Sequence, residues 1–391
     1  ANGNSTEFSA YHGYWPISFT HVDERFGSPL ELYKMVTTAH EQNYNVLIDF
    51  VANHVHEEHP YFKQYPGRVT PKYLPNGELN TEKWDERRLT TWFDEFMPSL
   101  DLLNPEVTNM LADSIIYWQK TFGVDGFRHD ATKHIPHQFW RTLLHKMKEQ
   151  GLFNENAPYQ IGETYGSRDL VGSYVNTGEL NGQFDFNLYD DVVAVFAAGE
   201  NIERLNYGLQ KSLFAFGHHH LMGNISGNQD KARFISYADG AVRFDEDAKA
   251  AGWMRTITRK DSTAYQKMAL LFAFNFTVPG VPVIYYGDEI GMPGGNDPDN
   301  RRMMKFKNLS KNEQQLKQTV SDFAKQRANS MSLLFGETNS YVNDNGLLII
   351  ERSYFGEKTT LVINNSSQNK TYNNDALKAY TYKILKTNEH E

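Results

Sequence analysis

Three acidic residues each come directly after a short run that is typical of a buried strand. Asp49 follows Val46-Leu-Ile48, Asp130 follows Gly126-Phe-Arg-His129, and Glu163 follows Tyr159-Gln-Ile-Gly162. Carboxyl groups attack carbon as nucleophiles and exchange protons as general acids and bases. A single acid at a strand end is more often a solvated loop residue or a helix cap. Acids at several equivalent strand ends instead favour one shared site, so the sequence predicts carboxylate chemistry at one edge of a sheet.

The segments around these acids alternate between strand and helix patterns. Ser28-Pro29-Leu30-Glu31 is a capping box with proline at the first helical position, and it begins a helix that ends near residue 42. Asn104-Pro105 begins a second helix, and Gly123 ends it. The apolar face of a third helix comprises Phe139, Leu143, Leu144 and Met147. Strands that alternate with helices indicate a parallel sheet or barrel, and the active sites of (β/α)8 barrels lie at the carboxyl ends of the strands.

The alternation is interrupted at two places. Residues 55–104 form a long polar excursion, which we interpret as an inserted subdomain because a structureless loop of that length is uncommon in a compact domain. Residues 334–391 contain β runs on both sides of Phe355-Gly356 without a helix between them, which predicts a small antiparallel, sandwich-like β domain. The catalytic barrel would then comprise residues 1–54 and 105–333.

Composition narrows the function classes. The chain has 391 residues, of which 40% are hydrophobic and 22% charged, as in ordinary globular proteins. A formal net charge of −9 and scattered basic residues argue against a nucleic-acid partner. No apolar run approaches the roughly 18 residues of a membrane helix. Because the chain has no cysteine, disulfides, thiolate zinc sites and cysteine nucleophiles are excluded.

Several segments together resemble the signatures of a known family. Four of them are Asp49-Phe-Val-Ala-Asn-His54, Gly126-Phe-Arg-His-Asp-Ala-Thr-Lys-His134, Gly162-Glu163 and Asn228-Gln-Asp230. The others are Tyr11-His-Gly-Tyr-Trp15, Val281-Pro-Val-Ile-Tyr-Tyr-Gly-Asp-Glu-Ile-Gly291 and Asp297-Pro-Asp-Asn-Arg301. By these segments and their order along the chain, the sequence resembles the α-amylase family of glycoside hydrolases from Tyr11 to about Met304.

The resemblance implies a (β/α)8 barrel that hydrolyses α-1,4-glucosidic bonds in starch, maltooligosaccharides or cyclodextrins with retention of configuration. It assigns Asp130 as the nucleophile, Glu163 as the general acid/base and Asp230 as the third acid, which stabilises the transition state. A retaining pair needs carboxyl groups about 5–5.5 Å apart. Arg128 lies two residues before Asp130 on the same strand, and therefore on the same face, where it can hold Asp130 ionised.

The resemblance also implies a set of residues that bind the sugar. These are His12, Tyr14, Trp15, His54, Arg128, Lys133, His134, Asn228 and Gln229. Gln229 stands where the family usually has histidine; a glutamine still donates a hydrogen bond but cannot become cationic. The implied partner is an α-glucan oligosaccharide or polysaccharide.

A metal is less clearly implied. Calcium-dependent members of the family have an acidic ligand at the position of Ser99, within Met97-Pro-Ser-Leu-Asp101. Calcium prefers several carboxylate or carbonyl oxygens, and Asn53 with the carbonyl of His134 could still contribute to such a site. We therefore expect no required cofactor, with calcium as the open alternative. The histidine groups His218-His-His220 and His56-Glu-Glu-His59 lack the spacing of a metal site.

Other functions remain as alternatives. Lys133-His134 favours an endo-acting α-amylase, whereas the Met97-Pro98 opening favours a cyclodextrin-hydrolysing enzyme. A maltodextrin transglycosylase is a further alternative within the enzyme class. A non-catalytic amylase-like binding protein belongs to a different class; such proteins lose catalytic acids, whereas this chain keeps all three.

The beginning of the chain carries a further expectation. In the family, two barrel strands and the helix between them precede the segment that here begins at Tyr11. Residues 1–9 form a polar loop without a β pattern, so the helix that starts at Pro29 matches the second barrel helix. We expect strands three to eight only, in an N-terminally truncated barrel with unpaired strand edges.

Overall fold

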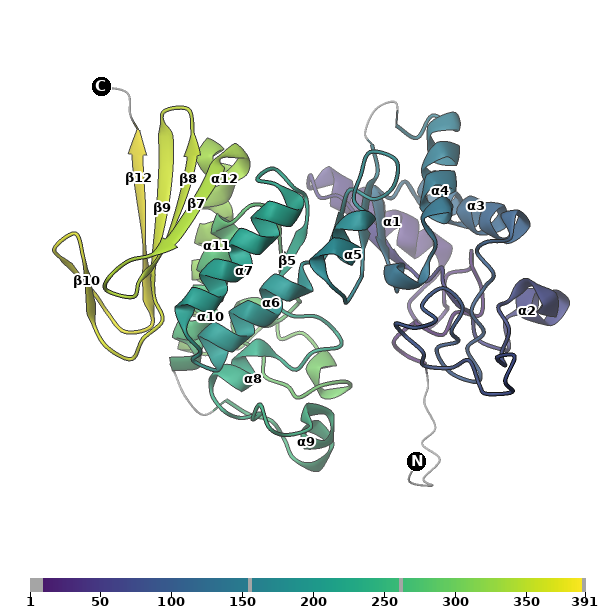
Figure 1. The fold of residues 1–391 in the computed structure, drawn as a ribbon, viewed down its shortest axis with the longest axis horizontal. Helices are drawn as coiled ribbons and strands as arrows, with labels where there is room; N and C mark the ends of the chain where they lie inside the picture. The colour runs from purple at the N-terminus through teal and green to yellow at the C-terminus, as the bar shows by residue number, and fades with distance from the viewer. Residues whose placement is uncertain (1–9, 154–156, 260–262, 389–391) are drawn as a thin grey trace. The chain divides into compact units, whose positions relative to one another are not determined.

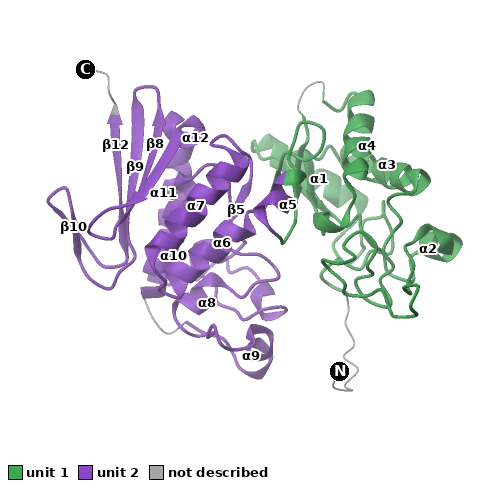
Figure 2. Cartoon of the chain, in the orientation of Figure 1, with its two compact units in different colours: residues 1–166, 173–183 green, residues 167–172, 184–391 purple. Residues whose placement is uncertain are grey.

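The computed structural model of the chain describes residues 10–153, 157–259 and 263–388 (Figure 1). Contacts divide the chain into two compact units (Figure 2): unit 1 comprises residues 1–166 and 173–183, and unit 2 comprises residues 167–172 and 184–391. The polar loop expected at residues 1–9 lies outside the described residues. The domain boundaries expected after residues 54, 104 and 333 do not coincide with these units and stay predictions.

A parallel sheet forms the centre of unit 1. Its strands are β1 (Leu47–Phe50), β2 (Gly126–His129), β3 (Tyr159–Gly162) and β4 (Gly182–Gln183), hydrogen-bonded in that order. The register pairs Asp49 with Arg128 and His129 with Gly162. Because paired residues of adjacent strands point to the same face, Asp49 and Arg128 emerge side by side.

Two helices of unit 1, α1 (Pro29–Glu41) and α3 (Pro105–Phe122), begin at the capping residues that the sequence predicts. Unit 1 also contains α4 (His137–Glu149) and the one-turn η2 (Thr132–His134). The Ser28 hydroxyl accepts from the backbone N–H of Glu31, and Asn104 accepts from that of Glu106. Gly123 ends α3 at φ 71°, a left-handed conformation that glycine adopts without steric cost.

The excursion at residues 55–104 has little regular structure. It contains α2 (Pro60–Gln64), the turn η1 (Pro66–Arg68) and isolated β-bridges such as Thr81 with Trp92. Trp92 is 5% exposed, and its indole N–H donates to the carbonyl of Thr70 at 2.9 Å. The segment is thus ordered by a buried aromatic side chain and by isolated backbone pairs, without a regular sheet.

Unit 2 consists of helices around one parallel strand pair, β5 (Gly223–Ile225) and β6 (Val281–Val283). Its helical elements are α5 (Arg168–Ser173, whose last residue belongs to unit 1), α6 (Phe186–Val192), η3 (Val193–Ala197), α7 (Ile202–Phe216), α8 (Phe234–Ala238), α9 (Ala248–Met254), α10 (Thr263–Thr277), η4 (Asp288–Ile290), η5 (Asp299–Arg301), α11 (Lys311–Ala328) and α12 (Met331–Phe335). The described residues thus contain six strands with parallel partners, in sheets of four and two. The expectation that the chain holds only strands three to eight of an N-terminally truncated barrel stays a prediction.

The antiparallel sheet predicted near the C-terminus is present. Its strands are β7 (Glu337–Val342), β8 (Leu348–Tyr354), β9 (Glu357–Asn364) and β12 (Thr381–Asn388), in the order β12-β9-β8-β7. The short pair β10 (Lys370–Tyr372) and β11 (Asp375–Leu377) lies between β9 and β12 in sequence. Alternate side chains of β8 and β9 join the core formed by α10 and α11, among them Ile350 and Ile363. The sheet therefore shares the core of unit 2.

Buried histidines make the stability of the fold sensitive to acid. Burial lowers the pKa of His59, His129, His134 and His220 to about 4 each. In the unfolded chain a histidine pKa is about 6.5, so between about pH 6.5 and pH 4 the unfolded state binds more protons than the folded state. Stability therefore falls as pH falls through this window, by up to about 1.4 kcal/mol per pH unit for each such histidine.

We expect urea unfolding to report this dependence. In a series from pH 7 to pH 4.5, the unfolding free energy of His129→Leu should depend less steeply on pH than that of the wild type. The decrease in slope corresponds to about one bound proton, because His129 is 0% exposed. The matched control is His145→Leu, since the His145 side chain is 70% exposed on α4. Equal slopes for His129→Leu and the wild type would contradict the prediction.

Candidate active site

One guanidinium group joins the three strand-end acids in unit 1. Arg128 Nη1 donates to Asp49 Oδ1 at 2.7 Å and to Asp130 Oδ1 at 2.8 Å, and Arg128 Nη2 donates to Glu163 Oε2. The side chains of Arg128, Asp130 and Glu163 are 13%, 12% and 16% exposed. Asp49 satisfied the same strand-end criterion as the other two acids but was not included among the expected site residues, and its contact with Arg128 places it in the site.

Backbone contacts set the position of the two acids. The Asp130 N–H donates to the carbonyl of Phe50 at 3.0 Å, and the Glu163 N–H donates to the carbonyl of His129 at 2.9 Å. Each acid therefore continues the ladder of its strand by one residue. Gly162, just before Glu163, has no room for a side chain, since a Cβ there would lie 2.7 Å from Thr132 Oγ1 and 2.8 Å from Leu180 Cδ1.

The charges of the cluster do not balance. Burial alone would lower the pKa of Arg128, but the carboxylates of Glu163, Asp130 and Asp49 raise it well above its ordinary value. Arg128 therefore stays cationic, and one positive charge faces three acids. Burial, together with the carboxylate of Asp130, raises the pKa of Asp49. Such effects allow one carboxyl group of a cluster to hold a proton while another stays ionised.

The aromatic residues expected to bind sugar contact one another and reach Asp49 through Tyr14. The Tyr14 hydroxyl donates to Asp49 Oδ2 at 2.7 Å, and the Tyr14 N–H donates to His12 Nδ1 at 2.9 Å. His54 Nε2 lies 3.0 Å from the carbonyl of Tyr14, which can only accept, so this nitrogen carries the proton. The Trp15 ring packs edge-on against His12 with ring centroids 4.9 Å apart. Burial lowers the pKa of His54, so it stays neutral.

Lys133 and His134 contact the excursion. Lys133 Nζ donates to Asp85 Oδ1 at 3.1 Å, and His134 Nδ1 donates to the carbonyl of Arg88 at 2.7 Å. His134 is 5% exposed, and Trp84 and Phe93 pack edge-on against its ring. These contacts favour a positioning role for His134, which differs from the direct sugar contact that the sequence suggested.

Asn53 and Ser99 occupy the position at which calcium was considered. Asn53 Nδ2 donates to Ser99 Oγ at 3.3 Å, and Ser99 Oγ donates to the carbonyl of Thr91 at 2.6 Å. A calcium site would need these groups to present oxygens to the ion, together with carboxylates. Within the described residues no group of three or more histidine or acidic side chains could hold a metal ion. Asn53 and Ser99 thus bond to one another and to a backbone carbonyl, and the expectation on calcium stays a prediction.

The residues of the fourth motif lie in unit 2, in the loop after β5. Asn300 Nδ2 donates to the carbonyls of Gln229 and Lys231 at 2.7 and 2.8 Å, and Arg301 Nε donates to that of Gln229 at 3.1 Å. Asp230 accepts from Arg301 Nη2 at 3.3 Å, and its side chain is 56% exposed. Asn228 accepts from the Asp230 N–H at 3.0 Å. Asn300 and Arg301 thus order the loop; both lie in the segment Asp297–Arg301 that carried the resemblance.

A buried ion pair between Arg233 and Asp288 anchors Asn300, which orders this loop. Arg233 Nη1 donates to Asp288 Oδ1 at 2.8 Å, and both side chains are 1% exposed. Arg233 Nε also donates to the carbonyl of Asn300 at 2.9 Å, so the residue that holds the loop is itself anchored.

Two of the histidines in the group His218-His-His220 contact an acidic side chain. His218 and His219 both contact the carboxylate of Glu337.

A family profile decides the classification. The profile described as "Alpha amylase, catalytic domain" matches residues 5–332. This chain belongs to the α-amylase family. It is therefore of the glycoside hydrolase type, with the barrel-type fold of that family and a C-terminal antiparallel sheet.

Individual relatives are more distant. A cyclomaltodextrinase from Bacillus sp. is 29% identical over 320 residues, which covers 75% of this chain and 49% of the relative. An intracellular maltogenic amylase from Bacillus subtilis is 25% identical over 328 residues, which covers 78% of this chain and 48% of the relative. The chain therefore spans about half the length of these curated relatives. Among solved structures, an α-amylase from Geobacillus thermoleovorans complexed with acarbose is 25% identical with a TM-score of 0.80, covering 97% of this chain and 85% of that one.

In the part of the chain that the structure describes, no helix is both long and apolar enough to cross a membrane.

Proposed function

We propose that this α-amylase family member hydrolyses α-1,4-glucosidic bonds in starch-type glucans with net retention at the anomeric carbon. The observation that carries the proposal is the contact of Arg128 with both Asp130 and Glu163 at the ends of adjacent strands. One guanidinium between two carboxylates keeps them close together, in keeping with the spacing of about 5–5.5 Å in retaining enzymes.

The first step uses Asp130 as nucleophile. Glu163, carrying a proton, donates it to the glycosidic oxygen while Asp130 attacks the anomeric carbon from the opposite face. The bond between carbon and leaving oxygen breaks, and a glycosyl ester forms on Asp130. Arg128 and the Asp130 backbone contact with Phe50 hold the attacking carboxylate in place.

The second step releases the sugar. Glu163, now ionised, accepts a proton from water, the water oxygen attacks the anomeric carbon, and Asp130 leaves as a carboxylate. Two inversions give net retention, and Glu163 regains its proton. Asp230 is assigned to stabilise the positive charge that develops on the sugar ring. Tyr14, Trp15 and Asn228 are assigned to bind the sugar, with His12 and His54 fixing Tyr14.

Cyclodextrin is a second candidate substrate. The relatives named cyclomaltodextrinase and the Met97-Pro98 opening favour it, whereas Lys133-His134 favours linear starch. Product profiles on soluble starch, β-cyclodextrin and pullulan separate these substrates. Release of reducing sugar from starch or β-cyclodextrin by the wild type, and its absence in Asp130→Asn, supports the hydrolase. Transfer products without reducing-sugar release would indicate a transglycosylase. If no product of either kind were detected, the chain would be a binding protein without catalytic activity.

We also propose that the activity does not require calcium, because Asn53 and Ser99 bond to one another and to a backbone carbonyl. Prolonged EDTA treatment is expected to leave the melting temperature and the activity unchanged. A ligand that binds only the native state raises its stability, so an essential ion would be revealed by its removal. A drop of many degrees that calcium restores, and magnesium does not, would contradict this proposal.

A further inference from the structure

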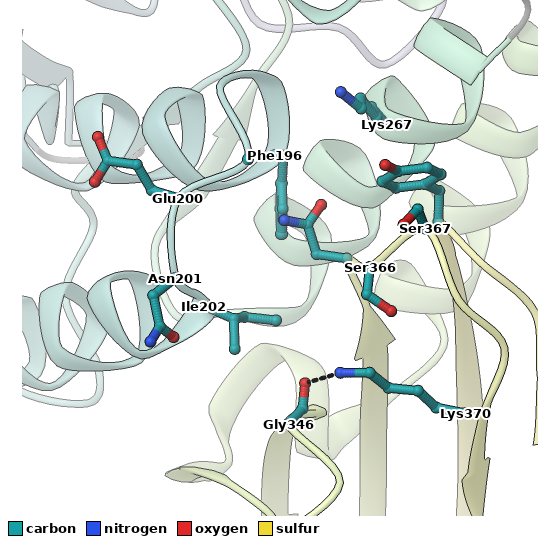
Figure 3. A pocket seen from close by; sticks show the side chains of 12 residues that line it. Phe196, Glu200, Asn201, Ile202, Lys267, Gly346, Ser366, Ser367 and Lys370 are labelled. Atoms are coloured by element: carbon teal, nitrogen blue, oxygen red, sulfur yellow. Dashed lines mark hydrogen bonds between the residues drawn. The ribbon is translucent and has the colours of Figure 1, made fainter.

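A cavity of about 420 Å³ lies within unit 2, between its helices and the C-terminal sheet (Figure 3). Phe196, Asn201 and Ile202 line it at the turn from η3 to α7, and Ser366 and Ser367 line it in the loop that follows β9. The volume lies in the range of small-molecule sites, which is roughly 300–1,000 Å³. The lining shares no residue with the candidate active site.

The polar groups of the cavity combine fixed donors with fixed acceptors. Lys370 Nζ donates to the carbonyl of Gly346 at 2.8 Å, and Lys267 Nζ donates to the carbonyls of Ala197 and Ala238 at 3.3 and 3.4 Å (Figure 3 draws the first of these). A ligand beside such pairs meets an ammonium donor and a carbonyl acceptor together. A hydroxyl group satisfies both, because it donates and accepts.

The same groups disfavour an anion. An anion would face the carbonyl oxygen of Gly346, which lines the cavity beside the Lys370 ammonium group. The N-terminus of α7 is already capped, since Asn201 Oδ1 accepts from the Glu203 N–H at 3.0 Å and Glu203 places a carboxylate in the first turn. The positive end of the helix dipole is therefore partly neutralised.

Tyr380 supplies an aromatic surface in a strained conformation. Its φ is 46°, in the left-handed region that a bulky residue rarely adopts, and such outliers cluster at ligand sites. The Tyr380 N–H donates to the carbonyl of Ser366 at 3.1 Å, and Lys267 Nζ lies 5.3 Å from the ring centroid. Together with Phe196 and Ile202, the ring offers apolar contact beside hydroxyl-binding groups, which matches a pyranose with its C–H faces and hydroxyl edge.

We propose that this cavity is a second, non-catalytic site that binds a short segment of α-glucan. The choice of α-glucan among neutral sugars rests on the proposed function of the active site. A chain bound here is not cleaved, because no described catalytic acid lines the cavity. The site instead retains a polysaccharide on the enzyme.

The test compares binding to granular starch with turnover of maltotriose. Tyr380→Gly removes the ring and relieves the left-handed strain, and Ile202→Trp fills the cavity. Each is expected to weaken retention on starch by about tenfold while kcat/KM on maltotriose stays unchanged. Phe355→Gly is the matched control, since Phe355 also has a left-handed φ of 48° but is 91% exposed in the β8–β9 turn.

The outcomes are distinguishable. Retention equal to that of the wild type in both cavity variants would overturn the second site, whether or not the chain hydrolyses starch. Loss of retention in the Phe355→Gly control as well would also overturn it. Displacement of starch by inorganic phosphate would show an anion site and contradict the proposal. If Asp130→Asn retained full activity, the catalytic assignment would fail, while the difference between Tyr380→Gly and Phe355→Gly would still report on the cavity.

Discussion

Replacing Asp130 by Asn is expected to lower kcat on soluble starch by at least about 10³-fold, because the covalent step loses its nucleophile. Glu163→Gln is expected to cause a loss of similar size, since the leaving oxygen then departs without a proton. Both replacements are nearly isosteric, and an amide oxygen still accepts from Arg128, whose Nη1 lies 2.8 Å from Asp130 Oδ1. The melting temperature should therefore change little, and rates of reducing-sugar release measure the effect.

A control separates these losses from a general effect of removing a carboxylate. Asp113→Asn makes the same chemical change on α3, where Asp113 is 57% exposed and pairs with Lys146. Its activity should equal that of the wild type. Near-native turnover by Asp130→Asn or Glu163→Gln, in protein free of wild-type contamination, would remove the role assigned to that residue.

Replacing Arg128 by Met is expected to reduce both activity and stability. The substitution leaves Asp49, Asp130 and Glu163 without their shared cation, and breaking a buried ion pair from one side costs about 3–5 kcal/mol. The lower end applies, because the Asp49 side chain is 41% exposed and solvent screens its share. With the carboxylates no longer held, kcat should fall by at least about 10²-fold.

The pH dependence identifies the cause of the lost stability. Without Arg128 the three carboxylates repel one another, and this repulsion weakens as acid adds protons to the cluster. The difference in unfolding free energy between Arg128→Met and the wild type should therefore narrow as pH falls from 7 to 4. Arg204→Met is the control, since Arg204 is 43% exposed and pairs with Asp191 and Glu200 at the surface, where a pair contributes about 1 kcal/mol or less. A difference that stays constant with pH would indicate lost packing instead.

Features set by local chemistry could be predicted from the sequence. The ends of α3 follow from Asn104 and Gly123, since a cap and a left-handed C-terminal residue depend on a few neighbouring atoms. The strand-end position of Asp130 likewise follows from the strand-like run Gly126-Phe-Arg-His129 before it. The contact between Arg128 and Asp130 was expected from their spacing of two residues on one strand, and it is present.

Features set by distant residues could not be predicted. The burial of His134 depends on Trp84 and Phe93, which approach it only when the excursion folds. The packing of Ile350 and Ile363 into the core of unit 2 depends on residues far away in the sequence, as does the bond from Arg352 to the carbonyl of Thr277 at 2.6 Å. Asp49 could have been included in the site, because it met the strand-end criterion; its pairing with Arg128 required the register of β1 and β2.

The central claim is that Asp130 forms a covalent bond to the sugar, and trapping that bond tests it most directly. An α-glucosyl fluoride carrying a second fluorine that slows hydrolysis would be incubated with Glu163→Gln, and the intact protein and its peptides would be analysed by mass spectrometry. We predict a mass increase of one fluorinated glucosyl group, located on the peptide that contains Asp130 and absent in the double variant with Asp130→Asn. A label on Asp230 or Asp49, or turnover of the fluoride with direct inversion and no label, would contradict the account.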